Sequence, residues 1–388
     1  MKQKIAILGS TGSIGNNLLK IIEKNPKDFN IILLTANKNY KKLLSQAKKF
    51  NVKNLILNDV IAYNKAAIIL KNNKKVKLFR DFKSINKIFN KKIDYVMSSI
   101  VGLSGLLPTI EIIKYTNKIA IANKESLICG WKLISSELKR NNTEFIPVDS
   151  EHFSVWFGLK GHKNYDIDKI FLTASGGPFL NLPLKNFKKI KLSDALKHPN
   201  WKMGKKISID SATLTNKLLE LMEARNIFSL ELNKFSIFIH PDSYVHSIIK
   251  FKNGLTKFIL HDTDMRIPIE NTLNNSFNKT LNKKNLNLKK LNNLKLDTVN
   301  ISRYPIINLL KNIPNHHSLF DTVIVCSNEI IVDAFINKLI KFNEISKLML
   351  KIASNKEFDQ LKNSEPSSIT DILKINTRIK TLLSKHIN

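Results

Sequence analysis

Two acidic side chains that could share a cation stand close together near the middle of the sequence. Asp149 and Glu151 follow the apolar run Ile146–Val148, and residues two apart on an extended chain point to the same side. Two carboxylates that share a site need a cation between them, and oxygen ligands suit Mg²⁺ or Mn²⁺. An exposed acidic turn is the alternative. Because the chain has 63 basic residues and only 31 acidic ones, a paired acid after an apolar run favours the metal site.

A second set of polar residues lies on one stripe of a helix that is predicted from about residue 211 to residue 228. Asp210 or Ser211 is expected to cap this helix. The stripe consists of Thr213, Asn216, Lys217 and Glu220. Glu220 could supply a third metal carboxylate, and Asn216 and Lys217 could hold substrate oxygens. A solvated helix face with a Lys–Glu pair is the alternative interpretation.

Two loops have the composition of an anion-binding and closing segment. In Thr173–Phe179, Ser175 is followed by two glycines, which allow a backbone nest for an anion. The stretch His198–Lys205 is a polar loop bounded by Gly204 and carries Trp201, and such loops often close over a substrate. His198 could equally be a satisfied surface or core histidine, and Trp201 could belong to the core.

Glycines recur at every third position directly after the first apolar run. Gly9, Gly12 and Gly15 follow the predicted strand Ile5–Leu8 and precede a helical pattern. This spacing allows a tight turn, brings backbone N–H groups close to a pyrophosphate and places the anion at a helix N-terminus. It is one residue longer than the usual dinucleotide motif, and a merely structural turn is the alternative.

The end of the second predicted strand indicates which dinucleotide is bound. Enzymes that use NAD usually place an acid there to hold the ribose 2′-hydroxyl. This chain reads Thr35-Ala36-Asn37-Lys38-Asn39, with no acid and with one cation. The stretch therefore predicts NADPH, whose 2′-phosphate suits Lys38, although Lys38 could be one surface lysine among many.

The elements that position these residues alternate strand and helix over the first 150 residues, which predicts a parallel sheet covered by helices. The predicted fold class is α/β, with an N-terminal Rossmann-type parallel sheet, a central α+β catalytic domain and a C-terminal helical bundle. The expected divisions are 1–149 for the cofactor domain, 150–273 for the catalytic domain, 274–300 for an Asn- and Lys-rich linker, and 301–388 for the helical domain.

Composition narrows the class of protein. The net charge is +32, yet only six of the 63 basic residues are arginine. Nucleic-acid sites favour arginine for bidentate contacts, so this composition indicates compositional drift, and no nucleic-acid partner is expected. No apolar run reaches the length of a membrane span, and the first strand begins too early for a preceding signal or transit peptide. The two cysteines share no ligand spacing, so a reducing cytoplasm is the expected compartment. The high charge could still steer anionic substrates.

Taken together, these segments closely resemble the 1-deoxy-D-xylulose 5-phosphate reductoisomerase family. The matching stretches occur in the family's order and extend from the first strand past residue 265. They are GSTGSIG at 9–15, ANKES at 122–126, PVDSEH at 147–152, ASGGPF at 174–179, HPNWKMGKKISIDSAT at 198–213 and HPDSYVHS at 240–247. The resemblance implies reduction and rearrangement of 1-deoxy-D-xylulose 5-phosphate to 2-C-methyl-D-erythritol 4-phosphate, an isoprenoid precursor, by a homodimer that uses NADPH and Mg²⁺, Mn²⁺ or Co²⁺.

The resemblance also implies a role for individual residues. The metal ligands would be Asp149, Glu151 and Glu220. Substrate would contact Ser150, Ser175, His198, Ser211, Asn216 and Lys217, with Lys124 beside it. NADPH would contact Thr11, Gly12, Ser13, Ile14, Asn37, Lys38, Asn39, Asn123, Glu125 and Gly204. The closing loop would carry Trp201 and Met203.

Three positions depart from the family's usual residues: Asn37 replaces a glycine, Leu218 replaces a small residue, and in the stretch 325–329 only Asn328 and Glu329 match. Two other classes of protein fit less well. A semialdehyde dehydrogenase would need a catalytic cysteine in its substrate domain, whereas Cys129 lies in the first predicted domain and Cys326 in the helical one. A nucleic-acid-binding protein would need clustered arginines with interleaved aromatic residues.

Overall fold

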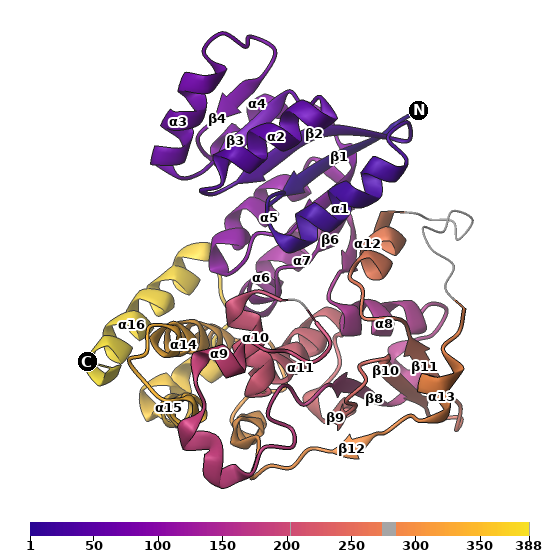
Figure 1. Cartoon of the computed structure of the whole chain (residues 1–388), viewed down its shortest axis with the longest axis vertical. Coiled ribbons are helices and arrows are strands. Elements are labelled where there is room, and N and C mark those ends of the chain that lie inside the picture. The colour runs from indigo at the N-terminus through magenta and orange to yellow at the C-terminus, as the bar shows by residue number, and fades with distance from the viewer. Residues whose placement is uncertain (202, 274–284, 388) are drawn as a thin grey trace. The chain divides into compact units, whose positions relative to one another are not determined.

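The computed structural model describes residues 1–201, 203–273 and 285–387, and the chain forms two compact units (Figure 1). Within the described residues, the first unit consists of 1–126, 133–149 and 265–273, and the second of 127–132, 150–264 and 285–387. The structure thus groups the C-terminal helices with the central residues, whereas the sequence predicted a separate helical domain. It also assigns residues 265–273 to the first unit.

A seven-stranded sheet forms the centre of the first unit. Its order is β4-β3-β2-β1-β5-β6-β7, and every neighbouring pair is parallel. The chain builds outward from β1 to β4 and then returns to the other side of β1, so the point of reversal lies between β1 and β5. The strands are β1 Gln3–Leu8, β2 Phe29–Ala36, β3 Asn54–Leu57, β4 Lys77–Phe79, β5 Ile93–Ser98, β6 Thr116–Ile121 and β7 Glu144–Pro147.

Helices cover this sheet because packing on it removes their apolar faces from water. The core takes Leu18 and Ile22 from α1 and Leu43 from α2, and α12 adds Ile269 and Leu273 from far along the chain. The helices are α1 Ser13–Lys24, α2 Tyr40–Phe50, α3 Val60–Leu70, α4 Ile85–Ile88, α5 Leu106–Ile113, α6 Lys124–Cys129, α7 Trp131–Arg140 and α12 Arg266–Leu273, with short 3₁₀ turns at Phe82–Ser84 and Leu103–Gly105.

The second unit contains a mixed five-stranded sheet of order β11-β10-β8-β9-β12. Strands β8 and β9 are parallel, and the other neighbouring pairs are antiparallel. The strands are β8 Ile167–Ala174, β9 Phe235–Ile239, β10 Val245–Phe251, β11 Thr256–Leu260 and β12 Asp297–Thr298. Strand β12 lies in the segment that the sequence predicted as a linker, while residues 274–284 of that segment lie outside the described residues.

Helices make up the rest of the second unit, and α14 packs against both α15 and α16. The helices are α8 Ser150–Gly158, α9 Leu192–Ala195, α10 Lys205–Ala212, α11 Thr215–Phe228, α13 Leu288–Asn292, α14 Leu319–Ile336, α15 Phe342–Ala353 and α16 Ile369–Ile387. Short 3₁₀ helices lie at Asn164–Asp166, Leu184–Lys189, Leu232–Lys234, Pro305–Lys311 and Lys356–Asn363. These elements confirm the predicted α/β class and the helical C-terminal region.

The helix predicted from Ser211 onward is wrong at its start. Two helices meet there, because Leu214 adopts a left-handed conformation with φ of 65° and separates α10 from α11. Asp210 does not cap a helix. Its buried carboxylate accepts a hydrogen bond from Asn328 Nδ2 at 2.8 Å and lies 3.0 Å from Lys206 Nζ. Asp210 therefore ties α10 to α14.

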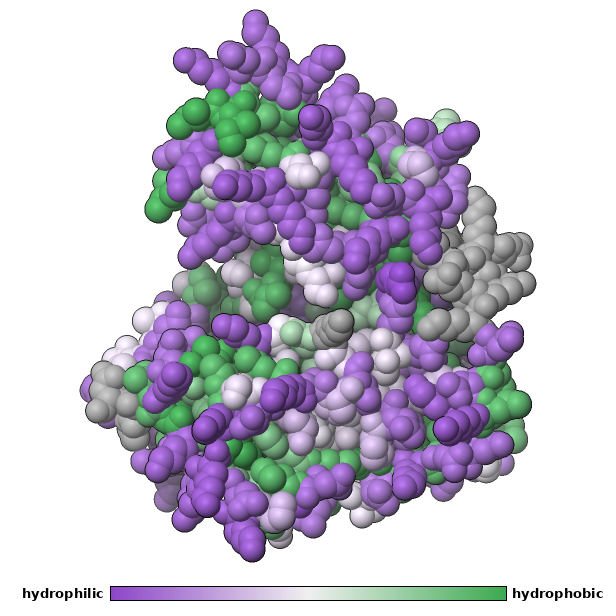
Figure 2. Space-filling model, viewed as in Figure 1, coloured by the Kyte–Doolittle hydropathy of each residue, from purple (hydrophilic) through white to green (hydrophobic). Residues whose placement is uncertain are grey.

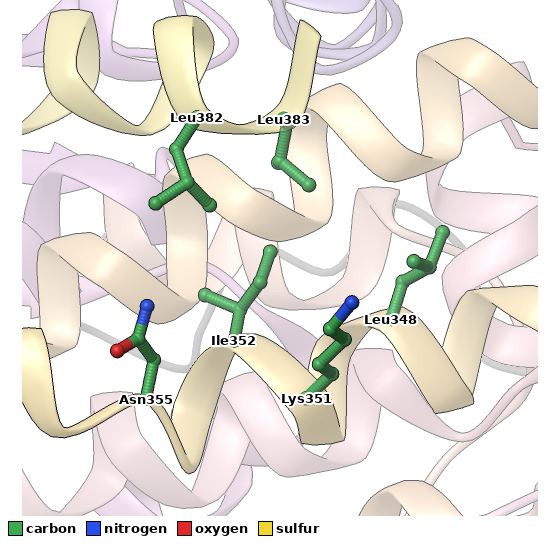
Figure 3. A pocket seen from close by; sticks show the side chains of 6 residues that line it. All are labelled: Leu348, Lys351, Ile352, Asn355, Leu382 and Leu383. Carbon is green, nitrogen blue, oxygen red and sulfur yellow. The ribbon is translucent and has the colours of Figure 1, made fainter. Parts of the chain in front are cut away.

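Among the described residues, the apolar features outside the predicted site include a surface patch and a cavity. Figure 2 shows a largely hydrophilic exterior with an apolar patch over α3, where Ile61, Ile68 and Ile69 are exposed. A cavity of about 240 Å³ lies between α15 and α16, and its lining includes Ile352 and Leu383 (Figure 3). It contains none of the predicted site residues. Among the described helices, none combines the length and the hydrophobicity that crossing a bilayer would require.

Candidate functional site

The first part of the site is the glycine-rich turn between β1 and α1. Gly9 has a φ of 84°, and a Cβ atom added to it would lie 2.8 Å from the carbonyl oxygen of Ser99. Both the left-handed backbone and this close approach require glycine. The turn therefore passes directly over the end of β5, at the point where the strand order reverses.

The start of α1 is open to an anion. Gly12 is its N-cap residue, no side chain caps the helix, and the first turn carries no acid. The first N–H groups of a helix have no partner within the helix, and the helix dipole adds positive potential there. The structure brings four predicted cofactor residues to this end of the helix: Thr11, Gly12, Ser13 and Ile14. The arrangement fits a pyrophosphate.

A network that the sequence analysis missed holds the turn in place. Gln46 of α2 is buried, and its Nε2 donates to the carbonyl oxygen of Ser10 and to Asn16 Oδ1, each at 3.0 Å. Ser10 Oγ donates to Gln46 Oε1 at 2.8 Å, and Thr35 Oγ1 accepts from the N–H of Gly9. The polar stripe on α2 is the sequence signal that could have revealed this network, because residues four apart lie on the same helix face.

The residues after β2 are exposed and include no carboxylate. Asn39 Oδ1 accepts a hydrogen bond from the N–H of Lys42 and caps α2, while Asn37 and Lys38 lie at the surface. Asn37 is not among the residues with positive φ, so this position does not require a glycine. The segment fits a ribose that carries a phosphate, because no residue from Thr35 to Asn39 is an acid.

The third predicted cofactor segment begins α6, directly after β6. The amide of Asn123 is engaged by the protein itself, since its Oδ1 accepts from the N–H of Ser126 at 2.7 Å and its Nδ2 donates to the carbonyl of Gly102 at 2.8 Å. Glu125 lies in the first turn of α6. Lys124 Nζ lies 2.9 Å from Asp149 Oδ2, so the first unit places these two predicted site residues together.

The second unit gathers two carboxylates around one ammonium group. Lys217 Nζ donates to Glu151 Oε1 at 2.7 Å and to Glu220 Oε2, and Asn216 Nδ2 donates to Glu220 Oε1 at 2.5 Å. Burial lowers the pKa of Lys217, but the two carboxylates more than offset this effect and hold its pKa above the usual value. Ser150 Oγ also donates to Glu151. The predicted helix face is therefore a buried polar cluster and not a solvated surface.

A buried histidine that the sequence analysis left without a role connects the helices of this cluster. His152 Nε2 lies 2.9 Å from the backbone carbonyl oxygen of Glu220, and its Nδ1 lies 3.6 Å from Glu223 Oε2. All three residues are buried. His152 thus fixes α8 against α11, which carry Glu151 and Glu220 respectively.

The donor set of the cluster fits a hard divalent cation. Carboxylate oxygens of Glu151 and Glu220 lie within 4.8 Å of each other, a separation that one ion can bridge. Oxygen ligands favour Mg²⁺ or Mn²⁺ over softer metals. Asp149 directly precedes Ser150, where the chain passes from the first unit into the second.

The Ser175 loop, also in the second unit, packs against the end of α10. Gly177 has a φ of 68°, and a Cβ atom there would lie 3.0 Å from the carbonyl oxygen of Ser211. Only glycine therefore lets this loop rest against the end of α10. Ser175 Oγ lies 3.0 Å from His198 Nε2 and accepts from the N–H of Gly177 at 3.1 Å. The structure thus brings Ser175, His198 and Ser211 into one neighbourhood.

Hydrogen bonds define the protonation state of His198. Its Nδ1 accepts from the N–H groups of Asn200 and Trp201, at 3.1 and 2.9 Å. The proton must therefore reside on Nε2, which donates to Ser175. Burial lowers the pKa of His198 to about 4. Ser175 Oγ therefore accepts in both of these bonds, and its hydrogen can donate to a further acceptor.

The remaining predicted residues lie around the start of α10. Gly204 is the exposed N-cap of this helix, and Met203 precedes it. The ring of Trp201 meets His246 edge to face at 6.2 Å, and His246 stacks on His261 at 3.6 Å. Both histidine contacts were missed, because they depend on strand pairing between β10 and β11.

A parallel sheet that carries a glycine-rich turn and an open helix end, joined to a unit with a carboxylate cluster, defines a dinucleotide-dependent oxidoreductase. Three family models match the chain, all of the same family. They are 1-deoxy-D-xylulose 5-phosphate reductoisomerase over residues 5–130, its C-terminal domain model over 145–228, and the DXP reductoisomerase C-terminal domain over 260–382. The chain belongs to the 1-deoxy-D-xylulose 5-phosphate reductoisomerase family.

Relatives match over nearly the whole chain. The 1-deoxy-D-xylulose 5-phosphate reductoisomerase of Pelagibacter ubique is 52% identical over 98% of this chain and 99% of that protein, and that of Clostridium novyi is 35% identical over the full length of both. The Zymomonas mobilis enzyme in complex with NADPH has a TM-score of 0.87 at 31% identity and covers all of both chains. A crystal structure of DOX-P reductoisomerase with NADPH, fosmidomycin and magnesium has a TM-score of 0.90 at 28% identity, covering 99% of this chain and 98% of that one.

Proposed function

We propose that this chain converts 1-deoxy-D-xylulose 5-phosphate to 2-C-methyl-D-erythritol 4-phosphate, with NADPH as reductant and a divalent metal ion. Full-length identity to enzymes of that name supports the reaction, and relatives in complex with NADPH and magnesium support the cofactors. The observation that carries the proposal in the structure itself is the cluster of Glu151, Lys217 and Glu220. Its carboxylate oxygens can bind a metal ion, and the ammonium group of Lys217 can bind substrate oxygens.

The metal would be held by Asp149, Glu151 and Glu220, all of them oxygen donors suited to Mg²⁺, Mn²⁺ or Co²⁺. When bound, the ion supplies Lewis-acid stabilisation of charge on substrate oxygens during the carbon–carbon rearrangement, and NADPH supplies the hydride. Lys217 and Lys124 each pair with a carboxylate of this set, so they hold the acids in place and present N–H donors to substrate oxygens.

The substrate phosphate would bind at the nest formed by the Ser175 loop. Ser175 Oγ accepts from His198 and from Gly177, so its own hydrogen is left to donate to a phosphate oxygen. Ser211, at the end of α10, and Asn216, at the start of α11, would complete the set of donors. Neutral His198 keeps this arrangement across the physiological pH range, because its pKa is about 4.

The cofactor would lie along the turn and the strand ends of the first unit. Thr11, Gly12, Ser13 and Ile14 would bind the pyrophosphate, and Asn37, Lys38 and Asn39 the adenosine ribose and its phosphate. Asn123 and Glu125 would flank the nicotinamide end, and Gly204 would also contact the cofactor.

A homodimer in the cytoplasm completes the proposal. Phe171, Ile248 and Phe258 form a cross-strand row on the sheet face opposite to the residues that pack on α8, and Phe258 is exposed. Such a row suits an interface between two copies. Both cysteines are free and buried, which suits a reducing compartment. A Phe258→Glu variant should run as a monomer in light scattering, and an unchanged mass would exclude this face.

The direct test is NADPH oxidation at 340 nm with 1-deoxy-D-xylulose 5-phosphate and Mg²⁺ or Mn²⁺. Oxidation should require the metal, stop with EDTA and be weak with NADH. Folded protein that oxidises no NADPH under these conditions would overturn the proposed function.

A further inference from the structure

We propose that Lys42 is a specificity-determining residue, whose ammonium group binds the phosphate that NADPH carries on its adenosine ribose and NADH lacks. The inference rests on the proposed function, since it assumes that the dinucleotide lies along the glycine-rich turn. It adds a second cation to Lys38, which the sequence alone had indicated for this phosphate.

Helix α2 directs Lys42 toward the cofactor turn. Lys42 lies in the first turn of α2, and its Nζ donates to the carbonyl oxygen of Thr11 at 3.1 Å. Asn39 fixes the start of the helix by accepting the N–H of Lys42 at 3.2 Å. The side chain of Lys42 is partly buried, whereas Lys38 and Lys41 are exposed. Lys42 is therefore a cation with a defined position at the turn.

A neighbouring side chain on the same helix face makes this position rigid. Gln46 lies one helical turn after Lys42, and residues four apart on a helix share a face. Gln46 is buried and bonds to Ser10 and Asn16 at 2.8–3.0 Å. Two side chains thus anchor α2 on the turn, so the helix backbone that carries Lys42 is held in place.

The chemistry of Lys42 suits a phosphate. An ammonium group has three N–H donors, and Nζ of Lys42 bonds to one acceptor among the described residues. In parallel dinucleotide-binding sheets the pyrophosphate lies at the first helix N-terminus, and the ribose lies beside the residues that follow the second strand. Lys42 reaches from the segment after β2 to that turn, so it stands between the two positions. No carboxylate in Thr35–Asn39 competes for its charge.

One alternative gives Lys42 a different role. Its bond to Thr11 could serve only to brace the turn, or its charge could act on the pyrophosphate, which both dinucleotides share. These roles would affect NADPH and NADH equally, whereas binding of the ribose phosphate affects NADPH alone.

The experiment is a fluorescence titration of NADPH and of NADH with the full chain. It compares wild type with Lys42→Gln, with Lys42→Arg, which keeps the charge, and with Lys41→Gln, which removes the same charge from an exposed neighbour. Lys42→Gln should raise the Kd for NADPH at least about tenfold and change the Kd for NADH less than about twofold. Lys42→Arg should restore most of the NADPH affinity, and Lys41→Gln should resemble wild type.

Equal losses for the two dinucleotides, or no loss for NADPH, would overturn the assignment of Lys42. If Lys41→Gln weakened NADPH as much as Lys42→Gln, a general charge effect would explain the data and the assignment would also fail. Wild type that binds no NADPH would instead overturn the proposed function, so the two failures are distinguishable.

Discussion

The candidate site has one part in each unit, and each part is stabilised by a different kind of interaction. In the first unit, the hydrogen bonds that support the glycine-rich turn come mostly from neutral groups, the amides of Gln46 and Asn16 and the hydroxyls of Ser10 and Thr35, and Lys42 adds one bond to the Thr11 carbonyl. In the second unit, charged groups support one another, with Lys217 between Glu151 and Glu220. The turn presents donors to an anion, and the cluster presents acceptors to a cation.

This difference determines what each half requires from its ligand. A network of neutral hydrogen bonds is complete without the cofactor, so the turn is preorganised for binding. The carboxylates of half-buried Glu151 and buried Glu220 repel each other unless a cation separates them, and Lys217 supplies only one charge. We therefore expect the carboxylate cluster to respond to metal removal and to charge changes far more strongly than the turn responds to loss of NADPH.

The largest effect is expected for Glu220→Gln. The amide keeps the size of the side chain but removes one of the charged oxygen ligands, so turnover should fall roughly a hundredfold or more and the metal concentration for half-maximal activity should rise. Metal titration of NADPH oxidation measures both quantities. Glu231→Gln, at an exposed acid of the same unit, is the matched control. Turnover of Glu220→Gln at the wild-type level in limiting metal would remove Glu220 from the ligand set.

A smaller effect is expected for Gln46→Leu in the neutral network. Leucine leaves the Ser10 carbonyl and Asn16 without their donor, which should lower the free energy of unfolding by about 1–3 kcal/mol. The loosened turn should bind both dinucleotides about tenfold more weakly, in contrast to Lys42→Gln. Urea denaturation and cofactor titration test this together. Unchanged cofactor affinity in a destabilised variant would show that the network supports the fold and not the binding turn.

The third effect in order of size is the change in stability expected when the pH is lowered toward the pKa of His198. Its pKa is about 4 in the folded chain, below the ordinary value of about 6.5 in the unfolded chain. Between these values the unfolded state binds a proton that the folded state does not, so stability should decrease as the pH falls from about 6.5 to about 4. Thermal melts of His198→Gln should show a shallower decline over that range. Parallel curves for the two proteins would exclude this assignment.

The smallest effect is expected for Asn37→Gly. The family usually has glycine here, but Asn37 does not adopt a positive φ in the structure. The substitution should therefore change the free energy of unfolding by less than about 1 kcal/mol and leave NADPH affinity within about twofold. Chemical denaturation and fluorescence titration measure these quantities. A clear gain in NADPH affinity would mean that the asparagine side chain hinders the cofactor.

Much of this site could be predicted because its residues lie next to strand ends. Gly9–Gly15 and Asp149–Glu151 each follow an apolar strand, and the carboxyl ends of parallel strands are where ligands bind in such sheets. The first sheet was also predictable, since its strands are continuous apolar runs separated by amphipathic helices. Only β4, with three residues, was too short to produce a pattern.

The missed features depend on tertiary contacts that a sequence pattern does not encode. The break at Leu214 was missed because leucine rarely adopts a left-handed conformation, and burial on every side of α11 removes the amphipathic signal. Leu218 is fully buried, so this departure from the family adds to the core. The partners of His152 lie on another helix, and β12 pairs with β9 across more than fifty residues of chain.

The composition of the first unit has a consequence for synthesis on the ribosome. Helix α12 packs against α1, and Thr272 shares a 2.7 Å hydrogen bond with the buried hydroxyl of Tyr95, yet α12 is translated after residues 150–264 of the second unit. A nascent chain of 150 residues therefore lacks Ile269 and Leu273, which fill the core of its first sheet. The cofactor unit can reach its final packing only when about 273 residues have left the exit tunnel, so its completion depends on a segment that emerges after residues 150–264 of the second unit.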